Sequence, residues 1–349
     1  MILPELNKNN TIPEKNAKNL LLISDGFEER SLHWVSNLPK KNLFEKVVLF
    51  KSFPERESKI EELVCFLNGL TKDLLISRFD RDHIEESEQE IYQTLRTELS
   101  TFENIYIDIS VMSRMLIIIL VYLLRDLEIN LHIIYSEPMD YAPNEKDFEE
   151  HFEKQRVASI TPTIGVKNVI RTPMLSSSIM QEAPCLLVGF TSFNEQLMRA
   201  LLSSLSPSQL LLINSIPPHL KWRAKATFRV HQDIVNEYSA DNCVAKDGLL
   251  TRRASTLNYK ETFEHLSIIY KEYCFNRRII VSPTGSKMQA LACALFKICC
   301  RDVHIEYSCP ESYYIKNFSS SEIRDVHHIL IPDFHSYVKQ ASETYNLNG

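Results

Sequence analysis

The stretch Ile280–Lys297, IVSPTGSKMQALACALFK, decides how this chain is interpreted. It opens with apolar residues typical of a buried strand and closes with small and apolar residues typical of a buried helix. Between them lies a polar turn with one glycine, Gly285, although the whole chain contains only seven. A buried strand that passes through such a turn into a helix is the unit from which parallel α/β sheets are built.

The same pattern occurs in the first half of the chain. Asn104–Leu120 resembles Arg278–Leu295, and the triplet Ser113-Arg114-Met115 corresponds to Ser286-Lys287-Met288. Three more pairs of segments recur in the same order: LLLIS (20–24) with CLLV (185–188), VVLFKSFP (47–54) with LLLINSIP (210–217), and LHIIYSEP (131–138) with VHIEYSCP (303–310). Matches that keep their order predict an internal duplication.

Each half is expected to alternate strands with helices. Its apolar runs lack period-2 alternation, which indicates parallel strands covered on both faces. The sequence therefore predicts an α/β fold of two tandem Rossmann-like, doubly wound parallel-sheet units. The expected organisation is a flexible N-terminal arm (1–18), a first unit (19–160), a linker (161–184) and a second unit (185–349) with an insertion near 221–257, where Thr227–Val230 is a further possible strand.

Composition excludes several classes of function. The net charge is −6 and the pI is near 6.0, so no global basic field indicates direct binding to DNA or RNA, although a local basic pocket is not excluded. The eight cysteines form no CxxC pair, and His132 and His304 are expected to be structural, so no metal or cofactor is predicted. No HExxH or GxSxG motif and no nucleophile beside a base is present, so catalytic residues stay unknown.

The most apolar stretch, Met115–Leu124, is too short to span a bilayer and is expected to be a buried helix. The first 19 residues are polar and lack the apolar segment of a secretory signal. The expectation is a cytoplasmic protein that does not associate with a membrane.

Ligands of open parallel sheets bind beyond the carboxyl ends of the strands, and polar residues gather there in both halves. In the second half, the hydroxyls, glycine and cation of the turn fit an anion site at the start of a helix, although a capped helix with a surface lysine fits them too. The candidate ligand-binding residues of this half are Thr191, Asn194, Ser282, Thr284, Gly285, Ser286, Lys287 and Tyr307.

The first half offers the matching positions. Asp108 is expected to bind a ribose hydroxyl or a metal, or to cap the helix after it, and Glu28 and Glu29 are expected to complement a helix dipole. Tyr135, like Tyr307, either stacks on a base or is an ordinary strand residue. The candidate ligand-binding residues of this half are Asp25, Gly26, Asp108, Ser110, Ser113, Arg114 and Tyr135.

The turn Pro283–Met288, PTGSKM, resembles the ligand turn of the CRISPR-associated Rossmann-fold (CARF) sensors, and LLISDGFEER (21–30) looks like their other ligand loop. The related SAVED domains join two such units in one chain. The resemblance implies a cyclic oligoadenylate bound between two units, with Thr284–Lys287 on phosphate and ribose in one half and Ser110, Ser113 and Arg114 in the other. The sequence departs from the family pattern in VMSRM (111–115), which lacks glycine.

Three functions follow. The first is a sensor or regulatory subunit of prokaryotic antiviral defence that binds a nucleotide or cyclic oligonucleotide and signals to a separate effector, because the residues after Pro310 are too few for a nuclease domain. The second is an enzyme that cleaves the ligand in the same crevice, as a metal-independent phosphodiesterase or a nucleotide hydrolase. The third is a non-catalytic scaffold subunit, with the basic residues of the insertion as a contact surface.

Overall fold

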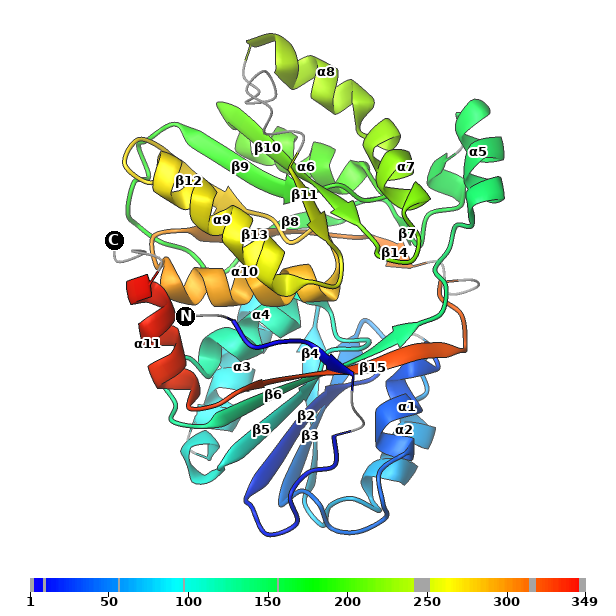
Figure 1. Cartoon of the computed structure of the whole chain (residues 1–349), viewed down its shortest axis with the longest axis vertical. Helices are drawn as coiled ribbons and strands as arrows, with labels where there is room; N and C mark the ends of the chain where they lie inside the picture. The colour runs from blue at the N-terminus through cyan, green and yellow to red at the C-terminus, as the bar shows by residue number, and fades with distance from the viewer. Residues whose placement is uncertain are drawn as a thin grey trace. The chain divides into compact units, whose positions relative to one another are not determined.

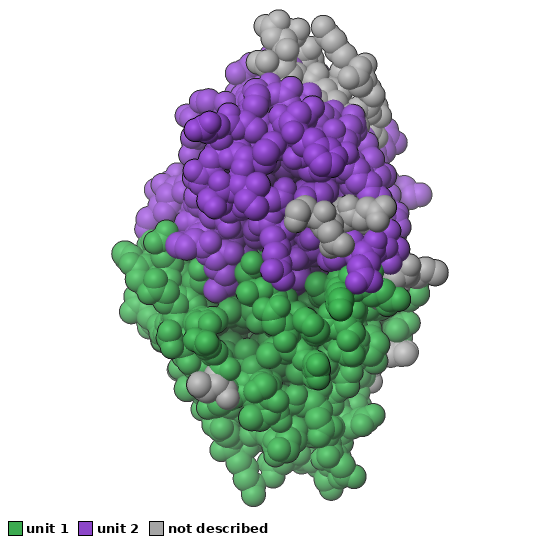
Figure 2. All heavy atoms as spheres, turned by 90° about the vertical axis from the view of Figure 1, so that its left-hand side faces the viewer, with its two compact units in different colours: residues 1–141, 318–341 green, residues 142–317, 342–349 purple. Residues whose placement is uncertain are grey.

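The computed structural model describes residues 3–8, 11–55, 57–96, 98–155, 157–241, 252–313 and 318–344. The chain divides into two compact units, coloured separately in Figure 2. Unit 1 comprises Met1–Tyr141 and Phe318–Ala341, and unit 2 comprises Ala142–Asn317 and Ser342–Gly349.

Unit 1 alternates strands with helices over most of its length (Figure 1). Its described strands are β1 (Asn7–Lys8), β2 (Asn19–Ser24), β3 (Lys46–Phe53), β4 (Leu74–Asp80), β5 (Asn104–Asp108), β6 (Asn130–Pro138) and β15 (Ile323–Ile331). Its described helices are α1 (Arg30–Ser36), α2 (Ile60–Leu67), α3 (Ile84–Arg96), the 3-10 turn η1 (Leu99–Thr101), α4 (Arg114–Leu123) and α11 (Phe334–Thr344), whose last residues fall in unit 2.

The described strands of unit 1 form one sheet in the order β1-β15-β6-β5-β2-β3-β4. Strands β2 to β6 run parallel, whereas β15 is antiparallel to β6 and β1 is antiparallel to β15. Numbered by their place in the chain, the parallel strands follow the order 3-2-1-4-5 that is typical of Rossmann-like sheets. The order reverses between β2 and β5, which is where such sheets bind ligands.

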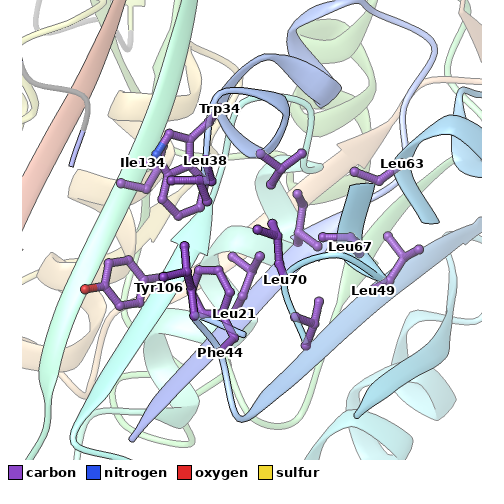
Figure 3. Packing of buried hydrophobic residues seen from close by; sticks show 14 of the residues in the cluster. Leu21, Trp34, Leu38, Phe44, Leu49, Leu63, Leu67, Leu70, Tyr106 and Ile134 are labelled. Carbon is purple, nitrogen blue, oxygen red and sulfur yellow. The ribbon is translucent and has the colours of Figure 1, made fainter. Parts of the chain in front are cut away.

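One hydrophobic cluster of unit 1 lies between the sheet and helices α1 and α2, whereas α3 and the buried helix α4 cover the other face (Figure 1). Apolar side chains of both helices pack on those of β2 and β3, and Trp34 of α1 stacks on Tyr106 of β5 with ring centroids 6.1 Å apart (Figure 3). Burying one large apolar side chain contributes about 1.5–3 kcal/mol. Packing of this kind on both faces fixes the strand ends that carry the candidate site.

Unit 2 has the same alternation. Its described strands are β7 (Thr163–Ile164), β8 (Asn168–Arg171), β9 (Cys185–Phe190), β10 (Gln209–Ile216), β11 (Arg253–Ser255), β12 (Arg278–Val281), β13 (His304–Cys309) and β14 (Ser312–Tyr313). Its described helices are α5 (Glu145–Glu153), the 3-10 turn η2 (Val157–Ser159), α6 (Gln196–Leu205), α7 (Trp222–Val230), α8 (Gln232–Asp241), α9 (Tyr259–Tyr273) and α10 (Lys287–Cys299).

The main sheet among the described residues of unit 2 has the order β11-β10-β9-β12-β13-β8. Strands β9 to β13 are parallel and again follow the order 3-2-1-4-5, and β8 is antiparallel to β13. Strands β7 and β14 form a separate antiparallel pair. The predicted fold class, α/β with two Rossmann-like units, is confirmed.

The boundaries of the units differ from those expected from the sequence. Strand β15 belongs to unit 1 and not to a second unit of 185–349, because it pairs with β6 along the edge of the unit 1 sheet. Residues 142–160 belong to unit 2 and not to a first unit of 19–160, because α5 packs on α7 through Phe148 and Trp222.

Segments expected to be irregular are also built into the sheets. The expected linker (161–184) contains β8, which pairs with β13. The described part of the expected flexible arm (1–18) contains β1, and Leu3 is buried. The polar strand β1 and the strand β8 therefore pair with β15 and β13, whose outer edges would otherwise expose unpaired backbone groups.

Further differences concern the middle of each unit. Thr227–Val230 lies in helix α7 and is not a strand. The sequence interpretation missed β4 and β11, each of which is the third parallel strand of its unit in chain order. Residues 242–251 of the expected insertion lie outside the described residues. Met115–Leu124 forms most of the buried helix α4, as predicted. Among the described residues, no helix is both long and apolar enough to cross a membrane.

Candidate functional site at the carboxyl ends of the parallel strands

Asp25 follows β2 and links this strand to its neighbour β3. Its carboxylate Oδ1 accepts a hydrogen bond from the backbone N–H of Ser52 at 2.9 Å, and the residue is buried. Gly26 comes next, and a Cβ atom on it would lie 2.8 Å from Cβ of Val111 in the loop after β5. Glycine is therefore needed here, because the loops on the two sides of the switch point touch.

Asp108, the last residue of β5, orders the loop that leads to α4. Its Oδ1 accepts a hydrogen bond from the N–H of Ser110 at 2.9 Å, and the hydroxyl of Ser110 accepts one from the N–H of Ser136 in β6 at 2.8 Å. The expectation that Asp108 caps the next helix is wrong, because Ser113 is the N-cap of α4 and accepts from the N–H of Leu116. Asp108 and Ser110 thus hold the strand ends of unit 1 in register.

Arg114 is the first residue of α4 and is half-buried. Within the described part of the chain, its guanidinium makes no hydrogen bond or ion pair. A helix N-terminus carries partial positive charge and exposed N–H groups. The start of α4 therefore combines these with a full positive charge at the carboxyl edge of the sheet.

Thr191 occupies in unit 2 the place that Asp25 has in unit 1. It follows β9, and its hydroxyl accepts a hydrogen bond from the backbone N–H of Ser215 at the end of β10, at 3.1 Å. Ser215 and Ser52 are the serines of the matching segments LLLINSIP and VVLFKSFP. The repeated sequences thus make the same contact between the first and second parallel strands of each unit.

Thr284 closes the switch point of unit 2. Its hydroxyl accepts from the N–H of Phe190 at 2.9 Å and donates to the carbonyl of the same residue at 2.8 Å. Thr284 is 2% exposed and the neighbouring Ser282 is fully buried. The Thr284 side chain therefore ties the end of β9 to the loop after β12, and this hydroxyl is engaged inside the fold.

Gly285 and Ser286 form the start of α10. Ser286 is the N-cap and forms a capping box with Gln289: its hydroxyl accepts from the Gln289 N–H, and Gln289 Oε1 accepts from the Ser286 N–H at 2.8 Å. A Cβ atom on Gly285 would lie 2.1 Å from this Oε1. The glycine is therefore required by the packing of the capping glutamine, and Lys287, half-buried, is the first residue of the helix.

The remaining predicted residues lie at the same edges. Asn194 Nδ2 donates to the hydroxyl and the carbonyl of Thr163 in β7. Tyr307 is a buried residue of β13, and Tyr135 is a buried residue of β6. The structure thus brings seven candidates together in unit 1 and eight in unit 2, with most of their polar groups bonded to backbone.

A buried ion pair that the sequence interpretation did not single out supports the loop after β2. Arg30 donates to both carboxylate oxygens of Glu28 at 2.9 and 2.8 Å, with its guanidinium carbon 5.9 and 5.8 Å from the ring centroids of Tyr135 and Tyr141. Burial lowers the pKa of Arg30, but Glu28 and the two phenols outweigh this and raise it. Glu28 therefore neutralises a buried arginine and does not complement a helix dipole. The acidic and basic residues of the motif DGFEER (25–30) could have predicted this ion pair.

One group of described side chains has metal-ligand geometry. Single ligand atoms of Glu137, Asp325 and His327 lie within 4.8 Å of one another in unit 1. His327 Nε2 already lies 2.8 Å from Glu137 Oε2, and Lys8 pairs with Asp325 at 2.8 Å. These contacts account for the group as a cross-strand network of β6, β15 and β1.

No protein-family model matches this sequence, and no curated protein matches it either. Among solved structures, the fold is similar to a type III CRISPR defence DNA nuclease activated by cyclic oligoadenylate, with a TM-score of 0.44 and 10% identity over 83% of this chain and 65% of the nuclease chain. The chain thus spans just under two thirds of that nuclease. A universal stress protein from Archaeoglobus fulgidus DSM 4304 matches with a TM-score of 0.24 and 11% identity over 83% of this chain and 96% of that one. TM-scores of this size carry no argument about function.

Proposed function

We propose that this protein binds a nucleotide at the carboxyl edges of its Rossmann-like sheets. The observation that carries the proposal is the cation at the first position of the helix after the fourth parallel strand, Arg114 in unit 1 and Lys287 in unit 2. Both are half-buried, follow a serine N-cap and lie next to the switch point. A cation beside the N–H groups of a helix start is a favourable position for a phosphate.

The ligand and the biological role that we propose rest mainly on the sequence. We propose that the two units arose by duplication, since they share strand order and the contact of Asp25 with Ser52 and of Thr191 with Ser215. The resemblance of PTGSKM (283–288) to the turn of CARF sensors makes a cyclic oligoadenylate the first ligand to test. The protein would then be the sensor or regulatory subunit of an antiviral defence system that acts through a separate effector.

The test is a thermal-shift and calorimetric titration with AMP and with linear and cyclic oligoadenylates. A ligand at a hundred times its dissociation constant adds about 2.7 kcal/mol to the free energy of unfolding, which gives a visible shift. Arg114→Gln and Lys287→Gln each remove a charge-assisted bond and are expected to weaken binding by roughly tenfold or more. Lys146→Gln, at an exposed lysine of α5, is the matched control.

One observation favours the scaffold function instead. In unit 2 the hydroxyls of Thr284 and Ser286 bond to Phe190, Gln289 and Thr256 within the fold, so the turn stabilises itself. If no oligoadenylate or mononucleotide shifts the melting temperature, the nucleotide function is refuted, and pull-downs for a partner protein test the scaffold.

A further inference from the structure

A polar cavity of about 270 Å³ lies in unit 1 at the carboxyl ends of β2 and β3. Asp25, Ser52 and Ser58 line it, together with the first turn of α2. Its volume is near the lower end of the range found for small-molecule sites. It suits one nucleoside-sized group and not a whole oligonucleotide.

Asp25 presents an unsatisfied acceptor to this cavity. One carboxylate oxygen, Oδ1, accepts from the N–H of Ser52, whereas the other, Oδ2, has no hydrogen bond to any described residue. Asp25 is only 4% exposed. Because Oδ2 is not among the fully buried unpartnered atoms of the described residues, a ligand in the cavity can reach it and supply a hydroxyl or amine donor.

The charges around the cavity disfavour a phosphate as that ligand group. The lysines in the lining are already paired: Lys51 with Glu55 at 2.6 Å and Lys59 with Glu29 at 2.9 Å. Glu61 and Glu62 add negative charge in the first turn of α2. A neutral group that carries hydroxyls fits this lining better than an anion.

We infer that this cavity binds the ribose of the nucleotide, with Asp25 Oδ2 accepting from its hydroxyls. The inference rests on the proposed function and assigns a part of the ligand that Arg114 does not hold. The close approach of Gly26 to Val111 puts the loop that carries Asp25 beside the segment that leads into α4. A nucleotide therefore has its ribose site and its phosphate site on the two sides of one loop contact.

Calorimetry with AMP and 2′,3′-dideoxy-AMP tests the assignment. Hydrogen bonds from the ribose hydroxyls to a carboxylate are expected to make wild type bind AMP about 10- to 100-fold more tightly than the dideoxy analogue. Asp25→Asn keeps the acceptor for the Ser52 N–H but replaces Oδ2 with a donor, so it is expected to abolish this preference. Arg114→Gln is expected to weaken both ligands equally. Glu128→Gln, at an exposed carboxylate of unit 1 outside this lining, is expected to change neither.

The outcomes separate the two proposals. AMP binding with no preference over the dideoxy analogue, or with the preference intact in Asp25→Asn, overturns the ribose site and leaves the proposed function standing. Absence of binding by AMP and by every oligoadenylate overturns both. If Asp25→Asn melts well below wild type without ligand, the variant is destabilised and its binding is not used. The ratio of AMP to dideoxy-AMP affinity of wild type then decides whether the ribose site stands.

Discussion

Gly285→Ala tests whether the glycine of PTGSKM serves the fold or only a ligand. The added Cβ would lie 2.1 Å from Oε1 and 2.9 Å from Cδ of Gln289, so the glutamine has to move. Gln289 is fully buried and its Oε1 accepts from the Ser286 N–H at 2.8 Å and from the Ser215 hydroxyl at 3.2 Å. The substitution therefore breaks one bond of the capping box of α10 and the bond that joins α10 to β10.

The expected loss follows from those bonds. Each is worth about 1 kcal/mol net, so Gly285→Ala should lower the free energy of unfolding of unit 2 by about 2 kcal/mol without any ligand. In a Gln289→Ala background the obstructing amide is gone. The same substitution should then cost well under 1 kcal/mol, limited by the 3.1 Å approach to Cβ of Phe190.

The assay is urea denaturation followed by tryptophan fluorescence. The chain has two tryptophans, Trp34 in unit 1 and Trp222 in unit 2, so a Trp34→Phe background reports on unit 2 alone. A double-mutant cycle over Gly285 and Gln289 then gives the coupling energy, expected to be about 1–2 kcal/mol. Equal costs of Gly285→Ala in both backgrounds, or a cost below about 0.5 kcal/mol, would refute the packing argument.

Three further predictions concern unit 1 and are read from Trp34 fluorescence in a Trp222→Phe background. Arg30→Met leaves the Glu28 carboxylate buried without its partner and should cost about 3–5 kcal/mol, whereas replacing both residues by methionine should recover much of this; no recovery would contradict the pairing. Ser113→Ala removes the N-cap of α4 and should cost about 1 kcal/mol, with Ser113→Asp close to wild type as the control. Burial lowers the pKa of His132 to about 3 and that of His328 to about 4. Because the unfolded chain binds these protons from about pH 6.5 downward and the folded chain does not, the free energy of unfolding should fall between about pH 6.5 and pH 4. His328→Gln should make this fall less steep.

The arrangement of strands and helices could be predicted from local patterns. Continuous apolar runs, each followed by polar residues and an amphipathic or apolar segment, identified α4 and all the parallel strands except β4 and β11, because these patterns depend on burial that repeats along the chain. The polar turn that ends at Ser286 also gave the correct start of α10, since capping depends on residues close in sequence. The helix of the first half was expected to begin at Val111, whereas α4 begins at Arg114. The polar residues that follow the strands were also placed correctly at the carboxyl edges of the sheets, because their position depends only on where each strand ends.

The partners of those polar residues were decided by the tertiary structure. Thr284 bonds to Phe190, 94 residues away, and Gln289 bonds to Ser215; a capping turn and a phosphate-binding turn have the same local composition, so the sequence left both open. Strand β15 joins the sheet of unit 1 far from the rest of that unit in the chain. An apolar sequence predicts that a strand pairs with another strand, but which strand it pairs with depends on which sheet edge the folded chain leaves open.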